Sequence, residues 1–150
     1  MMSRKIKSDG SVKALYGVST GLRLKRPLIA SRVQAGFPSP ATDYLEGVLD
    51  LNEYLIKHPA ATFFARVEGE SMTGIGIFPD DIVIVDRSLE AGNNTVILAR
   101  YDGEFAIKRL RIENGEYFLV PENEDYPVLK INEELDFVVW GVVTAVIHKV

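Results

Sequence analysis

Apolar and polar positions divide this chain of 150 residues into two parts of different character. Residues 1–32 show no sustained apolar period, and Gly10, Gly17, Gly21 and Pro27 interrupt them. We therefore expect a mobile N-terminal arm, with a short strand or turn near residues 22–29. From residue 62 onward, short apolar runs alternate with turn residues, a pattern that predicts a compact antiparallel barrel or sandwich.

Seven apolar runs in the second part predict strands. They are residues 62–67, 82–86, 95–101, 104–112, 116–120, 128–131 and 137–147. Asp102-Gly103 joins two of these runs directly and is a strong hairpin signal, and further turns are expected at residues 91–94 and at Asn114-Gly115. The hairpin at Asp102-Gly103 places residues 104–112 in its second strand.

One short helix is predicted over residues 50–58. Asp50 and Glu53 have the spacing of a capping box, with aspartate in place of the usual serine or threonine, and Pro59 ends the run. Leu51 and Leu55 form one apolar side, which packing alone explains. We therefore expect a mainly β domain with this single helix.

The composition restricts the class of protein. A hydrophobic content of 47% in 150 residues suffices for one well-packed domain plus a tail. Because the chain has no cysteine, disulfides, thiolate zinc sites and thiol nucleophiles are excluded. No apolar segment approaches the roughly 20 residues that span a bilayer, and the first 30 residues lack a signal-peptide core. We expect a soluble, cytoplasmic protein with no membrane partner.

Charge is distributed unevenly along the chain. Residues 1–35 carry eight basic residues and one acidic residue, Asp9, whereas residues 36–150 have a formal charge of −11. A basic arm should be attracted to an acidic body at modest ionic strength. The arm lacks the two or three helices of a helix-turn-helix domain, so sequence-specific DNA binding is not expected, although weak contact with phosphates stays open.

A candidate nucleophile follows the first predicted strand. Ser71 lies in Glu68-Gly69-Glu70-Ser71-Met72, where Gly69 allows a tight turn that would leave the serine hydroxyl exposed. The alternative interpretation is an ordinary turn serine, which is the more common case for a serine close after a glycine.

A candidate base lies 37 positions later, at Lys108. Strand alternation puts it on the same face as Ala106, Leu110 and Ile112. Burial disfavours a charged ammonium, so a neutral amine could take the proton of a hydroxyl, as in a Ser/Lys dyad. The alternative is a lysine whose ammonium reaches water along its apolar neighbours.

Other catalytic groups are scarce. His58 and His148 are the only histidines, which leaves few candidates for a Ser/His/Asp triad and none for a histidine-rich metal site. Gly74 and Gly76 lie in a loop without the Gly-Lys-Ser or Gly-Lys-Thr ending of a phosphate-binding loop. We expect neither a cofactor nor a metal ion.

A second informative stretch is Val33-Gln34-Ala35-Gly36-Phe37-Pro38-Ser39-Pro40. The small Ala35 and the side-chain-free Gly36 would let an extended backbone approach a serine closely, and the two prolines oppose helix formation. The residues alone favour an ordinary linker over a peptidase substrate.

These motifs together resemble the UmuD branch of the LexA-type self-cleaving proteins. The resemblance rests on Gly69-Glu70-Ser71-Met72, Lys108 and the run Ala35-Gly36-Phe37-Pro38-Ser39-Pro40, and it extends from about Val33 to the C-terminus. It implies a LexA/UmuD-like β-barrel or sandwich with Ser71 as nucleophile and Lys108 as general base and acid. The backbone N–H groups of Ser71 and Glu70 would stabilise the oxyanion.

The resemblance also implies a substrate and partners. The bond between Ala35 and Gly36 would be cut by the protein's own serine, which divides the chain into an arm of residues 1–35 and a peptidase-like domain of residues 36–150. A RecA filament on single-stranded DNA would stimulate the cut in the SOS response to DNA damage. The shortened form would be a homodimer that joins a UmuC-type Y-family polymerase in error-prone translesion synthesis.

Two alternatives of other classes stay open at this point. One is a LexA-like self-cleaving transcriptional regulator that acts through its tail. The other is a non-catalytic β-barrel interaction module in which Ser71 and Lys108 are incidental.

Overall fold

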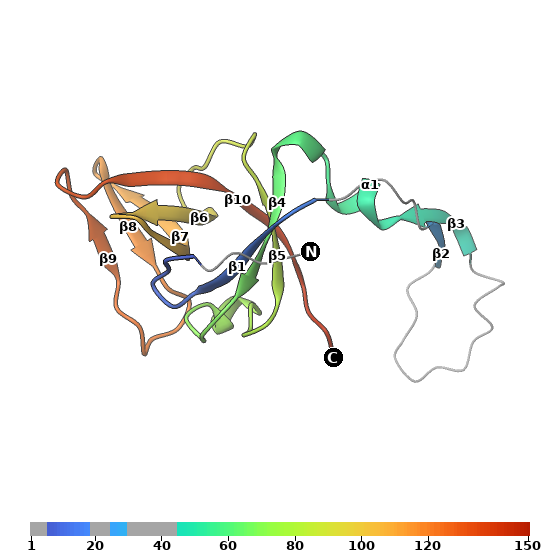
Figure 1. Ribbon diagram of the computed structural model, residues 1–150, viewed down its shortest axis with the longest axis horizontal. Coiled ribbons are helices and arrows are strands. Elements are labelled where there is room, and N and C mark those ends of the chain that lie inside the picture. Colours follow the sequence, from blue (N-terminus) through green and yellow to red (C-terminus); the bar gives the residue numbers. More distant parts are fainter. Residues whose placement is uncertain (1–5, 19–24, 30–44) are drawn as a thin grey trace. The chain divides into compact units, whose positions relative to one another are not determined.

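The computed structural model describes residues 6–18, 25–29 and 45–150 (Figure 1). The chain forms two compact units, one of Met1–Val18 with His58–Val150 and one of Ser19–Lys57. This division does not coincide with the expected boundary between residues 35 and 36. Ala35 and Gly36 themselves lie outside the described residues.

The smaller unit contains an antiparallel strand pair followed by a short helix. Strand β2 (Lys25–Ile29), within the range where a short strand was expected, pairs with β3 (Leu45–Asp50), and α1 (Leu51–Leu55) follows directly. The Asp50 carboxylate caps α1 by accepting a hydrogen bond of 2.9 Å from the Asn52 backbone N–H. The helix is shorter than predicted because Ile56 already has extended backbone angles (φ −117°, ψ 98°).

The larger unit is an antiparallel sheet of eight strands in the order β1-β4-β5-β10-β6-β7-β8-β9. The strands are β1 (Val12–Gly17), β4 (Thr62–Val67), β5 (Ile82–Asp86), β6 (Val96–Tyr101), β7 (Glu104–Glu113), β8 (Glu116–Val120), β9 (Leu129–Ile131) and β10 (Phe137–Ile147). Two single-turn 3-10 helices, η2 (Pro59–Ala61) and η3 (Thr73–Ile75), lie on either side of β4. The seven strands predicted from the pattern are confirmed to within a residue at each end, as is the mainly β fold.

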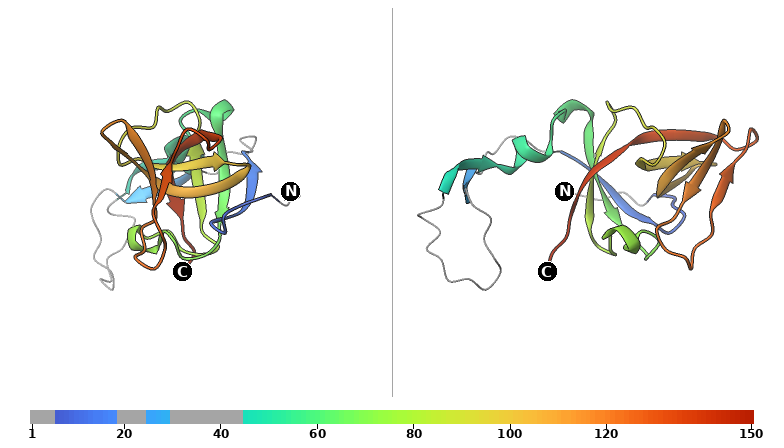
Figure 2. Two further views of the ribbon diagram at one scale, coloured as in Figure 1. Left: turned by 90° about the vertical axis from the view of Figure 1, so that its left-hand side faces the viewer. Right: turned by 180° about the vertical axis from the view of Figure 1, so that it is seen from behind.

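The sheet curls strongly, as the turned views show (Figure 2). Its long strand β10 pairs with β6 through its first half and with β5 through its second half, with register shifts in both ladders. Gly141 lies at one of these shifts, and a Cβ atom there would lie only 2.6 Å from Val85 Cγ1. Bulges of this kind increase local twist, which lets one strand serve both parts of the curled sheet.

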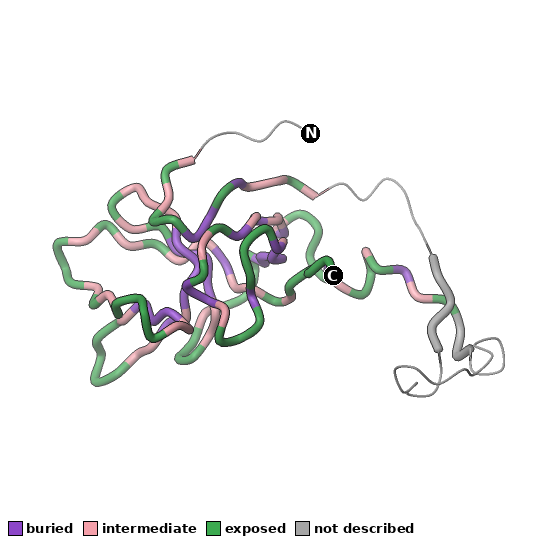
Figure 3. The backbone as a smooth tube through the Cα atoms, turned by 90° about the horizontal axis from the view of Figure 1, so that it is seen from below, coloured by how far each residue is buried: buried purple, intermediate pink, exposed green. Residues whose placement is uncertain are grey.

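The core of the larger unit lies inside the curl, where buried residues concentrate (Figure 3). One cluster is built around Val67, Met72 and Val85, and a second is built around Leu110 and Leu119. Met72, directly after the candidate nucleophile, is 1% exposed. The loop that carries Ser71 is therefore anchored in the core.

Strand β1 differs from the expectation of a mobile arm. The described residues 6–18 include a strand that pairs along β4, from Val12 opposite Val67 to Gly17 opposite Phe63. Val12 and Ala14 are 1% and 4% exposed, so this part of the N-terminal region belongs to the core of the larger unit. The strand was not predicted because it is stabilised by a partner about fifty residues away rather than by its own pattern.

Two tight turns set the position of β7. Asp102 and Gly103 both have positive φ values (46° and 81°), as do Asn114 and Gly115 (51° and 76°). Positive φ at both central residues is the geometry of the two-residue hairpin turn, so both turn predictions are confirmed. Within the described residues, no helix is long and apolar enough to cross a membrane.

Candidate active site

Ser71 lies in the loop that connects β4 to η3. Its backbone carbonyl accepts a hydrogen bond of 2.8 Å from the Glu122 N–H, and the Glu70 carbonyl accepts one of 2.8 Å from the Asn123 side-chain amide. Ser71 is only 5% exposed, which corrects the expectation of an exposed hydroxyl. The loop folds into the core instead of projecting from the strand end, because Met72 is buried there.

Gly69 meets two backbone constraints in this loop. Its φ of +69° is unfavourable for residues with a side chain, and a Cβ atom would lie 2.8 Å from the Gly10 carbonyl oxygen. The expected turn glycine is thus also the place where the N-terminal segment passes close to the Ser71 loop.

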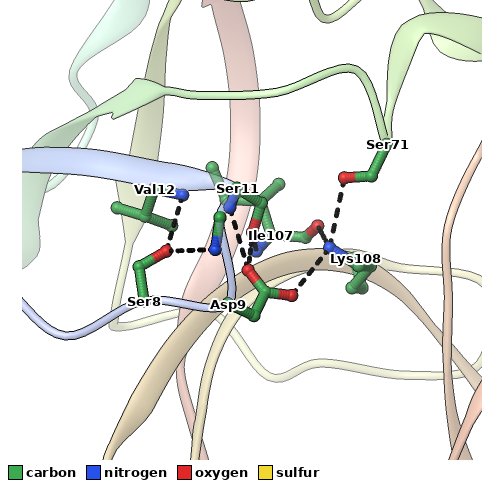
Figure 4. A network of polar contacts seen from close by, with 8 residues as sticks. Ser8, Asp9, Ser11, Val12, Ser71, Ile107 and Lys108 are labelled. Atoms are coloured by element: carbon green, nitrogen blue, oxygen red, sulfur yellow. Dashed lines mark hydrogen bonds and ion pairs between the residues drawn. The ribbon is translucent and has the colours of Figure 1, made fainter. Parts of the chain in front are cut away.

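Lys108 reaches Ser71 from β7. Its Nζ atom lies 3.2 Å from Ser71 Oγ and 3.1 Å from the Ile107 carbonyl oxygen (Figure 4). Lys108 is 8% exposed, as expected for a residue on an apolar strand face, and its partner across the ladder is the fully buried Ile97. The structure therefore brings the two candidate residues into hydrogen-bond contact.

A third residue, Asp9, completes the surroundings of the amine. Its Oδ2 atom lies 3.1 Å from Lys108 Nζ, and the two side chains are 16% and 10% exposed (Figure 4). Sequence reasoning did not assign Asp9 a place in the site. Its one distinguishing feature in the sequence is that it is the only acidic residue before Gly36.

The site opens into a cavity of about 560 Å³. Asp9, Gly69, Glu70, Ser71 and Lys108 line one side of it. The remaining lining residues are mainly apolar or aromatic and include Tyr101, Leu119, Tyr126, Val128 and Leu129. A cavity of this size and character can take several residues of an extended apolar peptide, with the Ser71 hydroxyl and the Lys108 amine at its wall.

Tyr101 is one of the residues that line this cavity. Burial, together with the negative charges of Asp9, Glu104 and Asp102, raises the pKa of Tyr101 to about 12. The phenol is therefore protonated and neutral at neutral pH.

The expected oxyanion donors lie at the turn. Among the hydrogen bonds of the described residues, none is donated by the backbone N–H of Glu70 or of Ser71. Both groups remain candidates for stabilising a developing negative charge near the Ser71 hydroxyl.

The two histidines bind other partners. His58 Nδ1 lies 2.6 Å from Asp86 Oδ2, and His148 Nδ1 lies 2.6 Å from Asp81 Oδ1. Neither histidine is among the residues that line the cavity.

No group of three or more metal-ligating side chains occurs in the described part of the chain. Among the cavity-lining side chains, the Lys108 amine is thus the basic group in contact with Ser71.

The arrangement can support acyl transfer. A hydroxyl and an amine in contact, both shielded from water, can exchange a proton while the oxygen attacks a carbonyl carbon.

Comparison with known proteins identifies the family of this chain. The Peptidase S24-like family matches residues 27–144, which include both Ser71 and Lys108. The chain belongs to the Peptidase S24-like family. This is a family of serine peptidases that cleave themselves.

Three relatives illustrate how much of the sequence is shared. The chain is 47% identical to Protein SamA of Salmonella typhimurium strain LT2, with 82% of this chain and 85% of that protein covered. It is 43% identical to Protein MucA of Escherichia coli, with 79% and 81% covered. It is 35% identical to the LexA repressor of Idiomarina loihiensis, with 93% and 72% covered. These matches confirm the resemblance to UmuD- and LexA-type SOS proteins.

Proposed function

We propose that this protein cleaves its own chain between Ala35 and Gly36, with Ser71 as nucleophile and Lys108 as general base and acid. The contact of 3.2 Å between Lys108 Nζ and Ser71 Oγ, inside a peptide-sized cavity, is the observation that carries the proposal. Membership of a self-cleaving family supports it.

The reaction proceeds in two stages. Neutral Lys108 takes the Ser71 hydroxyl proton while the serine oxygen bonds to the Ala35 carbonyl carbon. The peptide bond then breaks, the Gly36 nitrogen receives the proton from Lys108, and an ester joins Ala35 to Ser71. Water hydrolyses that ester with Lys108 again as base, which regenerates Ser71. The backbone N–H groups of Glu70 and Ser71 would stabilise the oxyanion in both stages.

Self-cleavage can be regulated because its substrate is part of the same chain or dimer. Well-oriented intramolecular attack reaches effective molarities of about 10⁵ to 10⁸ M, so the fraction of time that the cleavage segment is docked controls the rate. In our proposal a RecA filament on single-stranded DNA raises that fraction. The shortened form, as a homodimer, then joins a UmuC-type Y-family polymerase in translesion synthesis.

Incubation of the purified protein over a range of alkaline pH tests the chemistry. The wild type should yield fragments of residues 1–35 and 36–150, faster as pH rises, because the neutral fraction of Lys108 grows. Ser71→Ala and Lys108→Ala should each reduce the rate at least a hundredfold. Lys130→Ala, which removes an exposed lysine of β9, is the matched control and should cleave normally.

Addition of RecA filament to the same reactions tests the trigger. We expect faster cleavage at neutral pH in the wild type and none in Ser71→Ala. An intact wild-type chain under every condition would instead favour a non-catalytic interaction module.

A second candidate function is transcriptional regulation, which the similarity to a LexA repressor favours. The described residues before residue 30 form strands β1 and β2 rather than the helices of a helix-turn-helix domain. A gel-shift assay with intact protein and Ser71→Ala separates the two functions. Sequence-specific retardation of DNA would support the regulator.

A further inference from the structure

The first 35 residues contain one acidic side chain, and the structure places it against the proposed catalytic base. Asp9 Oδ2 lies 3.1 Å from Lys108 Nζ, and both side chains are largely shielded from water. An ion pair in such a place interacts more strongly than one at the surface, because solvent screens it less.

Asp9 is fixed in this position by contacts on both sides. Its backbone N–H donates to the Phe105 carbonyl at 3.0 Å, which ties it to the start of β7. Its Oδ1 atom accepts from the Ser11 backbone N–H at 2.9 Å and from the Ser11 hydroxyl, leaving Oδ2 directed at Lys108. Figure 4 shows the contacts from Ser11 and Lys108 meeting at the Asp9 carboxylate.

Ser11 in turn is held by the strand that carries Lys108. Its hydroxyl oxygen accepts a hydrogen bond of 3.0 Å from the Ile107 backbone N–H, and it is 3% exposed. Its carbonyl accepts from the Glu68 N–H at 3.0 Å, in the loop before Ser71. The segment Ser8–Ser11 therefore bridges the two chain regions that supply the candidate dyad.

The charge of Asp9 acts against the proposed chemistry. Lys108 must lose a proton before it can accept one from Ser71, and a carboxylate at 3.1 Å stabilises the charged form. We propose, on the basis of the function proposed above, that Asp9 is a positioning residue that keeps Lys108 charged and so restrains self-cleavage at neutral pH.

The other titratable groups around Lys108 do not take this role. Tyr101 on β6 is neutral because its pKa is about 12. Glu70 and Tyr126 line the cavity, but neither side chain forms an ion pair or hydrogen bond with Lys108 among the described residues. Arg109, next on β7, is paired with Glu122. Asp9 is the carboxylate in contact with the amine.

Restraint by Asp9 would link the base to the arm that the reaction cuts from the rest of the chain. Any event that withdraws Ser8–Ser11 from the site would remove the carboxylate and raise the neutral fraction of Lys108. Self-cleavage at Ala35 would sever the covalent link between Asp9 and the remaining domain.

The pH–rate profile of self-cleavage tests the proposal through Asp9→Asn, which removes the charge but keeps an oxygen for the Ser11 hydrogen bonds. The midpoint of the profile should move down by about one pH unit or more, so that the rate at neutral pH rises about tenfold or more. Asp80→Asn is the matched control. It removes the same charge from an exposed ion pair with Lys13, at a positive φ that asparagine tolerates, and should leave the profile unchanged.

A purely structural role would alter the maximal rate at high pH and leave the midpoint in place, and that result would overturn the proposal. An NMR titration of the Lys108 side chain in Ser71→Ala, with and without Asp9→Asn, gives an answer that does not depend on cleavage. The Lys108 midpoint should be lower in the Asp9→Asn variant, and equal midpoints would overturn the inference. Absence of cleavage in the wild type would contradict the proposed function while this titration still decides the role of Asp9.

Discussion

Lys108 has three oxygen atoms around its Nζ atom, and their arrangement fits both of its protonation states. As an ammonium it can donate to Asp9, Ile107 and Ser71. As an amine it can donate to Asp9 and Ile107 and accept the Ser71 hydroxyl proton. The heavy atoms need not move between these states. Activation of the site therefore requires only loss of one proton and arrival of the substrate segment.

A second carboxylate, Asp86, makes stability depend on pH. Burial would raise its pKa, but hydrogen bonds from Ser88 and His58 outweigh burial and hold the pKa below its ordinary value of 3.8. A depressed folded pKa contributes stability above the unfolded value, and this contribution is lost as pH falls through the folded value. Acid should therefore weaken the fold around Asp86.

Ser88→Ala tests this effect, because the Ser88 hydroxyl donates to Asp86 Oδ1. Urea unfolding should show a loss of about 1–3 kcal/mol at neutral pH that shrinks below about pH 4. Ser88→Thr keeps the hydroxyl and is the matched control. A loss that stays constant between pH 7 and pH 3 would contradict the role of the Asp86 charge.

At the scale of elements, β1 connects the N-terminal region to the domain that the proposed reaction would leave. Its ladder with β4 is reinforced by a hydrogen bond of 3.2 Å from Arg66 Nε to the Tyr16 hydroxyl. Val12 is 1% exposed and belongs to the main core cluster. Cutting the chain at Ala35 breaks none of these contacts.

We therefore expect the fragment of residues 1–35 to stay bound after self-cleavage. The two fragments should co-elute in size-exclusion chromatography and separate only when β1 is displaced. Val12→Ser, which removes buried apolar surface worth about 1.5–3 kcal/mol, should promote release. Lys13→Ser, on the exposed face of the same strand, is the control and should not. Immediate separation of the wild-type fragments would show that β1 does not hold the arm.

Release of β1 would also change the domain itself. Strand β4 would become the edge of the sheet, with unpaired backbone groups and a gap where Val12 and Ala14 had packed. In the proposed function, removal of the arm would thus alter surface shape as well as charge, since residues 1–35 carry +7.

Over the whole molecule, the parts that could be predicted from sequence are those with local signals. Short apolar runs between turn residues predicted the strands from β4 to β10. The dipeptide Asp102-Gly103 predicted the hairpin that positions Lys108. Ser71 and Lys108 could be paired only through the family resemblance, because their spacing fixes no geometry. Asp9 and β1 could not be found, because their positions depend on pairing with Phe105 and β4, far along the chain.

The activation of Ser71 by Lys108 is the claim on which the account depends, and covalent labelling measures it without the cleavage segment. A fluorophosphonate should modify Ser71 as fluoride leaves, at a rate that rises with pH, and mass spectrometry can assign the label. In Lys108→Ala the labelling should fall at least a hundredfold and lose its pH dependence. Equal labelling of Ser71 in the wild type and in Lys108→Ala would contradict the account.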